Sequence, residues 1–173
     1  MAKITFRDAK AYGVKLEMLQ KHFSSDKPLE EAVEAGAGVL ADAIRHSMDQ
    51  LPTEQFRRLS KGEVFEGVPL GQFLELQKNF GISPVRRDRN GFINAKVGWE
   101  GYNKYPTKSY PQGLPNAMVA AAIESGSSVR AKHPFVRPAV KMSTPRALKA
   151  MADHIDADCQ RVMEGGSVKT FIE

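Results

Sequence analysis

The C-terminal part of the sequence contains the residues that most resemble part of a metal site. His154 and Asp158 are four residues apart in a segment of helical periodicity, so both side chains should share one helix face, with Asp153 and Asp156 nearby. No second His or Cys pair has a matching spacing, and Cys159 falls on the apolar stripe of the same helix. We therefore interpret this group as a solvated acidic face and predict no metal and no cofactor.

Other patterns that could support catalysis are incomplete. Gly62, Gly67 and Gly71 do not form a phosphate-binding loop, because no Gly-Lys-Ser/Thr follows them and no strand precedes them. The sequence has no nucleophile-elbow motif and no pair of carboxylates that stands out as an acid and a base. We predict no enzyme activity and no small-molecule substrate.

Composition indicates one globular domain. The chain has 173 residues, of which 42% are hydrophobic and 26% charged, and none of its apolar runs reaches the roughly 20 residues of a membrane span. The N-terminus lacks the pattern of a secretion signal, and the single Cys159 suits a reducing cytoplasm. We expect no membrane contact.

Basic residues form two short groups, Arg57 with Arg58, and Arg86 and Arg87 with Arg89. With a net charge of +5, these groups are compatible with a nucleic-acid-binding module, which is the alternative function. Short basic runs more often form a solvated face, and charge at a hairpin tip also protects a sheet edge.

Periodicity predicts two long helices and several shorter elements. An apolar stripe predicts a core helix over about 28–51, and Gly36 on that stripe indicates a close crossing by another element. Ser143-Thr144-Pro145 predicts the start of a C-terminal helix that ends near 163. The shorter predicted elements are a strand within 1–8 and helices at 12–23, within 69–80, and from about 115 to Ser125-Gly126.

A β-hairpin is predicted in the middle of the chain. Residues 81–87 are extended around Pro84, Asn90-Gly91 is a turn signal, and 92–99 alternates between apolar and polar residues. The predicted fold is therefore α+β, with long amphipathic helices packed on a small antiparallel sheet. We expect a single domain over 1–164, with an N-terminal arm and short helix at 1–24, a long loop at 100–113 and a flexible tail at 165–173.

The segment 124–139 joins two helical patterns and is the predicted assembly interface. Pro134 and Pro138 restrict the backbone, so we expect a non-helical strut that presents Phe135. The alternative is that Phe135 plugs the core of its own chain, which is the commoner fate of an aromatic residue. The interface candidates combine this segment with loop tyrosines: Glu124, Ser125, Gly126, Pro134, Phe135, Arg137, Pro138, Tyr102, Tyr105 and Tyr110.

Three stretches resemble the Hong Kong 97-type minor tail component family of long-tailed phages and prophages, whose members are described as tail-completion or neck proteins. In order and spacing the resemblance spans about residues 27–164. The stretches are Gly71-Gln-Phe-Leu74 with Gly81-Ile-Ser-Pro-Val85, Gly91-Phe-Ile-Asn-Ala-Lys-Val-Gly-Trp-Glu-Gly-Tyr-Asn103, and Ala121-Ala-Ile-Glu-Ser-Gly-Ser-Ser128 leading to His133-Pro-Phe-Val-Arg-Pro-Ala139.

This resemblance implies a virion structural protein without enzyme activity. Such a subunit assembles as a homo-oligomeric ring at the head-tail junction and contacts neighbouring head-tail or tail-tube proteins. Nucleic acid would at most pass through the ring. The expected location is the virion, with assembly in the cytoplasm of the host bacterium.

Overall fold

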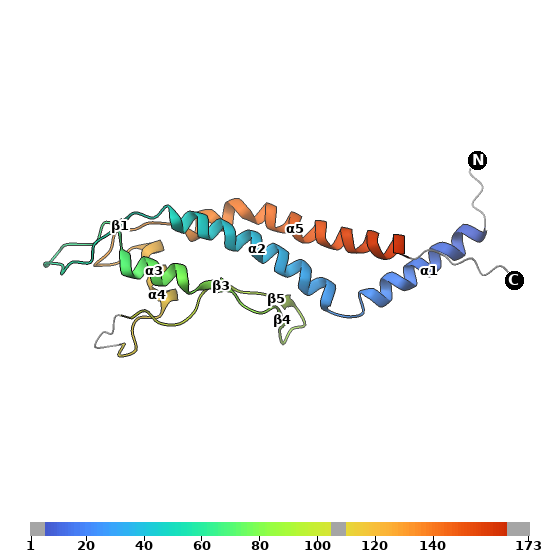
Figure 1. The fold of residues 1–173 in the computed structure, drawn as a ribbon, viewed down its shortest axis with the longest axis horizontal. Helices are drawn as coiled ribbons and strands as arrows, with labels where there is room; N and C mark the ends of the chain where they lie inside the picture. Colours follow the sequence, from blue (N-terminus) through green and yellow to red (C-terminus); the bar gives the residue numbers. More distant parts are fainter. Residues whose placement is uncertain (1–5, 105–109, 166–173) are drawn as a thin grey trace.

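The computed structural model describes the backbone of residues 6–104 and 110–165, and side chains from residue 12 to residue 164 within those ranges. The described part is an elongated α+β structure, in which two long helices run side by side and a small lobe covers one end of them (Figure 1). Its helices are α1 (Phe6–His22), α2 (Lys27–Asp49), α3 (Leu70–Lys78), α4 (Asn116–Ser125) and α5 (Val136–Gly165). Its strands are β1 (Thr53–Glu54), β2 (Val68–Pro69), β3 (Phe80–Ile82), β4 (Arg86–Arg87), β5 (Ile93–Asn94) and β6 (Val97–Trp99).

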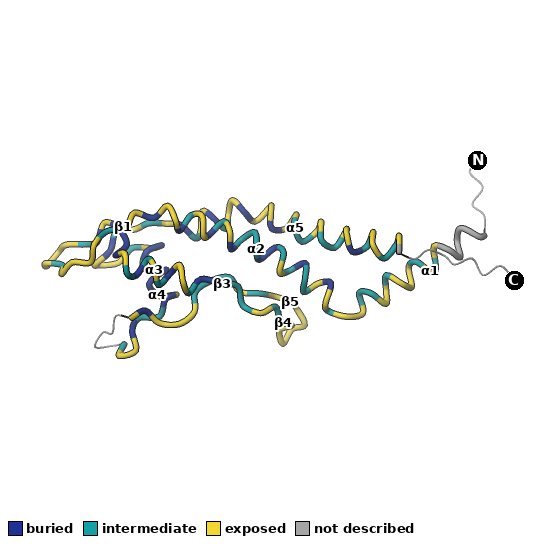
Figure 2. The backbone as a smooth tube through the Cα atoms, viewed as in Figure 1, coloured by how far each residue is buried: buried dark blue, intermediate teal, exposed yellow. Residues whose placement is uncertain are grey.

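Helix α2 is the core helix that the sequence predicts at 28–51. Pro28 lies in its first turn, where a missing N–H costs nothing, and Glu30 lies near the positive end of the helix dipole. Its buried stripe includes Ala41, Ile44 and Met48. Helix α5 packs antiparallel along α2, and buried residues line the faces between them (Figure 2).

Helix α5 begins at Val136, and the predicted start at Ser143-Thr144-Pro145 is wrong. Pro145 lies inside the helix, and the hydroxyls of Ser143 and Thr144 donate to the carbonyls of Ala139 and Val140, each at 2.7 Å. Both residues therefore bond to the preceding turn, as Ser and Thr do within helices, and neither caps a new one. The reason that the helix starts earlier lies in Glu124 and is described below.

Gly36 lies at a close crossing of α2 and α5 around Met151, as the sequence predicts. A Cβ at Gly36 would lie 2.6 Å from Cγ and 2.8 Å from Sδ of Met151, and 3.3 Å from the carbonyl oxygen of Ala147. Only a residue without a side chain leaves this room for α5.

The hairpin is present but interrupted. Strand β3 pairs antiparallel with β6, and β4 with β5, while the residues around Pro84 separate the two pairs. At the tip, Asp88 Oδ1 accepts the backbone N–H groups of Asn90 and Phe92, each at 2.9 Å, and Gly91 has a φ of 85°. Asn90-Gly91 thus makes the turn that the sequence predicts, and no side chain strains it.

The small lobe packs on α2. Strands β3, β5 and β6 contact α2, whereas α5 packs mainly on α2 itself. The predicted α+β fold, with long helices packed on a small antiparallel sheet, is confirmed. The core joins Ile44 and Met48 of α2 to Leu76 of α3, Ile123 of α4 and Phe135.

The N-terminal region is helical where a strand was predicted. Helix α1 starts at Phe6, so the strand prediction is wrong for residues 6–8, while residues 1–5 lie outside the described part. The tail prediction at 166–173 and the middle of the loop at 105–109 also lie outside it. Among the described helices, none combines the length and apolar character needed to cross a membrane.

The crossing at Gly36 gives the first prediction. Replacing a helical Gly by Ala ordinarily stabilises a helix by about 0.5–1 kcal/mol, and Gly38→Ala, with no heavy atom within 4 Å of the new Cβ, should show this gain. Gly36→Ala should instead lower the free energy of unfolding, because Met151 must move. Urea unfolding of both variants tests this, and Gly36→Ala should become favourable in a Met151→Ala background. Equal gains for both glycines would contradict the tight crossing.

Candidate functional site

The start of α5 is held by the side chain of a residue from the preceding helix. The Glu124 carboxylate, at the end of α4, accepts the backbone N–H groups of Phe135 at 2.7 Å, Val136 at 2.8 Å and Arg137 at 3.1 Å. The fourth residue, Pro138, has no N–H. The three N–H groups that this helix N-terminus would otherwise leave unpaired are therefore all bonded, and a negative charge lies at the positive end of the dipole.

This environment sets the ionisation of Glu124. Burial would raise its pKa, but the three backbone N–H groups and the guanidinium of Arg137, 3.8 Å away, outweigh burial and hold the pKa below its ordinary value of 4.5. Glu124 is 6% exposed, so the ionised carboxylate is an internal part of the fold.

Phe135 lies in the core of its own chain. Its side chain is 1% exposed, and its ring centroid lies 5.8 Å from that of Trp99, which in turn lies 5.0 Å from Phe80. The strut conformation expected around it is wrong, because α5 begins immediately after Phe135 and includes Arg137 and Pro138. Proline is compatible with the first turn of a helix, where its N–H is not needed.

The other interface candidates divide by exposure. Ser125, Pro134, Arg137, Pro138 and Tyr102 are exposed. Gly126 ends α4 with a φ of 78°, and Tyr110 is half-buried. Tyr105 lies outside the described residues.

The basic residues form two separate groups, one near β1 and the other on the β4–β5 hairpin (Figure 1). Arg57 pairs with Glu63 at 3.0 Å, and the Arg87 Nε donates to Asp26 Oδ2 at 2.7 Å. Arg58, Arg86 and Arg89 are exposed.

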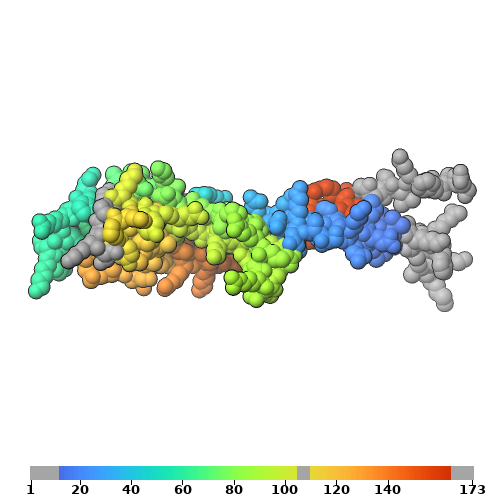
Figure 3. All heavy atoms as spheres, turned by 90° about the horizontal axis from the view of Figure 1, so that it is seen from below, coloured from blue at the N-terminus to red at the C-terminus, as the bar shows by residue number. Residues whose placement is uncertain are grey.

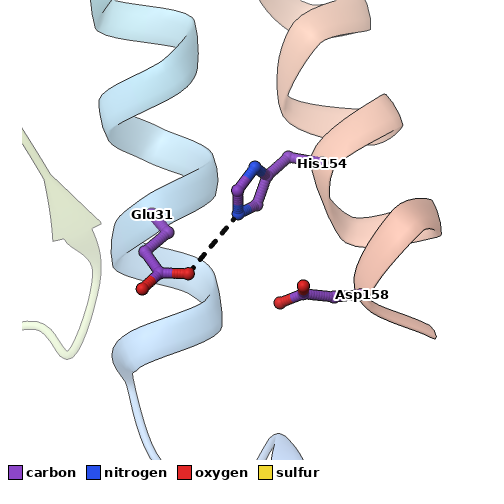
Figure 4. Close-up of side chains that lie close together, drawn as sticks. All are labelled: Glu31, His154 and Asp158. Atoms are coloured by element: carbon purple, nitrogen blue, oxygen red, sulfur yellow. Dashed lines mark ion pairs between the residues drawn. The ribbon is translucent and has the colours of Figure 1, made fainter. Parts of the chain in front are cut away.

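A cluster of histidines and carboxylates lies where three helices meet, and we call it the junction cluster: His22, Glu31, His154 and Asp158. Figure 4 shows Glu31 of α2 opposite His154 and Asp158 of α5, with one donor atom of each within 4.8 Å of the others. His22, at the end of α1, lies with Nε2 3.3 Å from Asp158 Oδ2.

The interpretation of this group as a solvated face is wrong for Asp158, which is buried, whereas Asp153 and Asp156 are exposed. The Asp158 side chain is 2% exposed. The hydrogen bond to His22 is the main influence that lowers its pKa, which burial raises and the charges of Arg161 and His154 lower further. The spacing of His154 and Asp158 was visible in the sequence, but their partners lie more than a hundred residues away along the chain, and periodicity alone does not connect them.

Helix α1 carries apolar side chains on both sides of the face that contacts α5. His22 marks that face, since it bonds to Asp158. At 100° per residue, Tyr12 and Leu16 flank one side of it and Val14 and Met18 the other. The exposures of these four side chains range from 40% for Met18 to 57% for Tyr12. On the face seen in Figure 3, α1 lies beside the end of α5 and beyond the small lobe.

Comparison with models of protein families, with curated proteins and with solved structures finds no match for this chain.

Burial of Phe135 gives a prediction about the monomer. Phe135→Ala should lower the free energy of unfolding by about 3–5 kcal/mol, because it removes a fully enclosed ring from the core. Phe92→Ala is the matched control, since Phe92 is 69% exposed on the hairpin and should change stability little. Chemical unfolding measures both. A folded Phe135→Ala monomer of native stability would show that the core does not depend on this ring.

The ionised cap at Glu124 gives a prediction about pH. Glu124→Gln keeps the shape but loses the charge, and should cost about 1.5–3 kcal/mol at neutral pH. Because the folded-state pKa is lowered, the advantage of the native protein is fully present above the unfolded pKa near 4.5 and is lost as pH falls through the lower folded value.

Unfolding of the native protein and of Glu124→Gln should therefore be compared from pH 7 downward. Ser125→Ala, an exposed neighbour, is the control for the position. A stability difference that does not shrink at acid pH would argue against a charged cap.

Proposed function

We propose that this chain is a structural protein of a long-tailed phage or prophage. In this proposal it is a tail component or tail-completion subunit that assembles with copies of itself into a ring at the head-tail junction. The support is the resemblance of residues 27–164 to the tail-component family, together with an α+β fold and a surface suited to association.

The observation that carries the proposal is the exposure of apolar residues on helix α1. A helix that is apolar on opposite sides is normally buried on both, yet the described part of α1 packs mainly on α5. Tyr12 and Leu16 on one flank, and Val14 and Met18 on the other, are left half-exposed. A second copy of the chain would supply the missing contacts, and two flanks allow each subunit to contact two neighbours, as a ring requires.

The extent of the surface also favours association. The chain exposes 12648 Å², whereas a compact monomer of 19.1 kDa exposes about 8,400 Å². Further surface is therefore available for burial between subunits.

The proposal predicts that association depends on the α1 flanks. Val14→Glu with Met18→Glu should convert the native oligomer to monomer, because two charges would be buried at the subunit contact. Helicity and melting of the monomer should be preserved, since both side chains are already partly exposed. Sedimentation velocity over a wide concentration range and negative-stain microscopy measure the outcome.

The control is Gln20→Glu with Lys21→Gln, which changes the net charge equally at exposed positions of α1 and should leave the oligomer intact. A native chain that stays monomeric at every concentration would refute self-assembly. Steeply salt-dependent binding of duplex DNA by that monomer, lost on substitution of Arg86 and Arg89, would instead support the nucleic-acid-binding alternative.

A further inference from the structure

The junction cluster contains a buried ring nitrogen, His154 Nε2, that has no hydrogen bond in the described part of the chain and faces carboxylates. Asp158 is buried, and its carboxylate is contacted by Arg161 Nη1, 2.8 Å from Oδ1, and by His22 Nε2, 3.3 Å from Oδ2. His154 Nε2 is also buried without a hydrogen-bond partner in that part, and lies 3.6 Å from Glu31 Oε2, which is beyond hydrogen-bond distance. A buried polar atom is rarely left in this state, so the ring nitrogen of His154 calls for a partner.

The chemical types of the ligand atoms in the cluster indicate that the missing partner is a cation. Glu31 and Asp158 contribute carboxylate oxygens, and His22 and His154 contribute imidazole nitrogens. Two imidazoles with two carboxylates suit a divalent first-row transition metal, and zinc in particular takes four such ligands in a tetrahedron. The i, i+4 spacing of His154 and Asp158 presents both to one side of α5, facing Glu31 (Figure 4).

The distances also fit a small ion. Bonds of about 2.0–2.1 Å in a tetrahedral zinc site place neighbouring donor atoms roughly 3.3–3.4 Å apart. The His22–Asp158 pair lies at 3.3 Å and the His154–Glu31 pair at 3.6 Å, while the three donors of Glu31, His154 and Asp158 fall within 4.8 Å. A small inward movement would bring Glu31, His154 and Asp158 together around one ion, whereas His22 contacts only Asp158 of this set and would have to move further to become the fourth ligand.

We propose that His22, Glu31, His154 and Asp158 form a binding site for one divalent transition-metal ion of the zinc type. The ion would link α1 to the α2–α5 pair. This site is separate from the proposed assembly role and does not depend on it.

Two exposed cations border the site and compete with a metal. Arg161, 71% exposed, pairs with Asp158, and Lys27, 78% exposed, lies 3.8 Å from Glu31. Both side chains are long and solvated, so they can turn away when an ion enters. Replacing either cation should therefore strengthen metal binding. If the cluster were only a network of ion pairs, the same replacement would remove a contact and would not create metal affinity.

The test is calorimetric titration of the chelator-treated, tag-free full-length chain with zinc chloride at neutral pH. We expect one Zn²⁺ per chain and a higher melting temperature in its presence. His154→Ala and Asp158→Asn should each weaken binding at least tenfold, with folding checked by circular dichroism. Arg161→Gln should tighten binding severalfold, and this gain keeps the test decisive even if a ligand variant unfolds.

Two controls address the other candidate ligands. His46→Ala, at the far end of α2, and Cys159→Ser, next to Asp158, should leave the affinity unchanged. The absorption spectrum of the Co²⁺-loaded chain should show tetrahedral bands without thiolate charge transfer. The proposal is overturned if the chain does not bind Zn²⁺, if binding survives His154→Ala with Asp158→Asn, or if Cys159→Ser abolishes it.

Discussion

The hydrogen bonds from the first turn of α5 to the Glu124 carboxylate determine which residues of α5 lie beside which residues of α2. They define where α5 begins, and this places Phe135 against Trp99 immediately before the first helical residue. Because a helix rises 1.5 Å per residue, the same start determines what lies further along α5. Met151 meets Gly36, and His154 meets Glu31 roughly 27 Å from the cap. The buried Glu124 carboxylate at the start of α5 thus helps to determine that His154, near the other end of the helix, lies opposite Glu31.

Local signals explain what the sequence could predict. The α2 stripe, the Asn90-Gly91 turn and the close crossing at Gly36 each depend on residues close together in the chain or on one backbone property, and all three are present. The start of α5 was misplaced because its cap comes from Glu124, eleven residues before Phe135. A Ser-Thr-Pro sequence resembles a helix start, whereas a distant carboxylate with Pro138 in the first turn has no short-range signature.

The junction cluster likewise could be predicted from the sequence only where its residues are close together in the chain. His154 and Asp158 could be paired from spacing, but Glu31 and His22 join them only through the antiparallel packing of α2 with α5 and the return of α1 onto the end of α5. Half of the donor set was therefore visible in the sequence and was interpreted as a solvated face. Burial of Asp158 reverses that interpretation, because an enclosed carboxylate needs partners that a solvated one does not.

Helix α1 is held by polar contacts near one end, while its apolar flanks are left open. His22 bonds to Asp158, and in the short connection to α2 Asp26 pairs with Arg87 of the hairpin. The Asp26–Arg87 pair is exposed and screened by solvent, so it orients the chain more than it stabilises it, whereas the His22 contact is made to the buried Asp158. The orientation of α1 and the surface that it offers are thus controlled by different residues. A change at the junction cluster can redirect the helix without altering its flanks, and a change on the flanks can remove a contact without moving the helix.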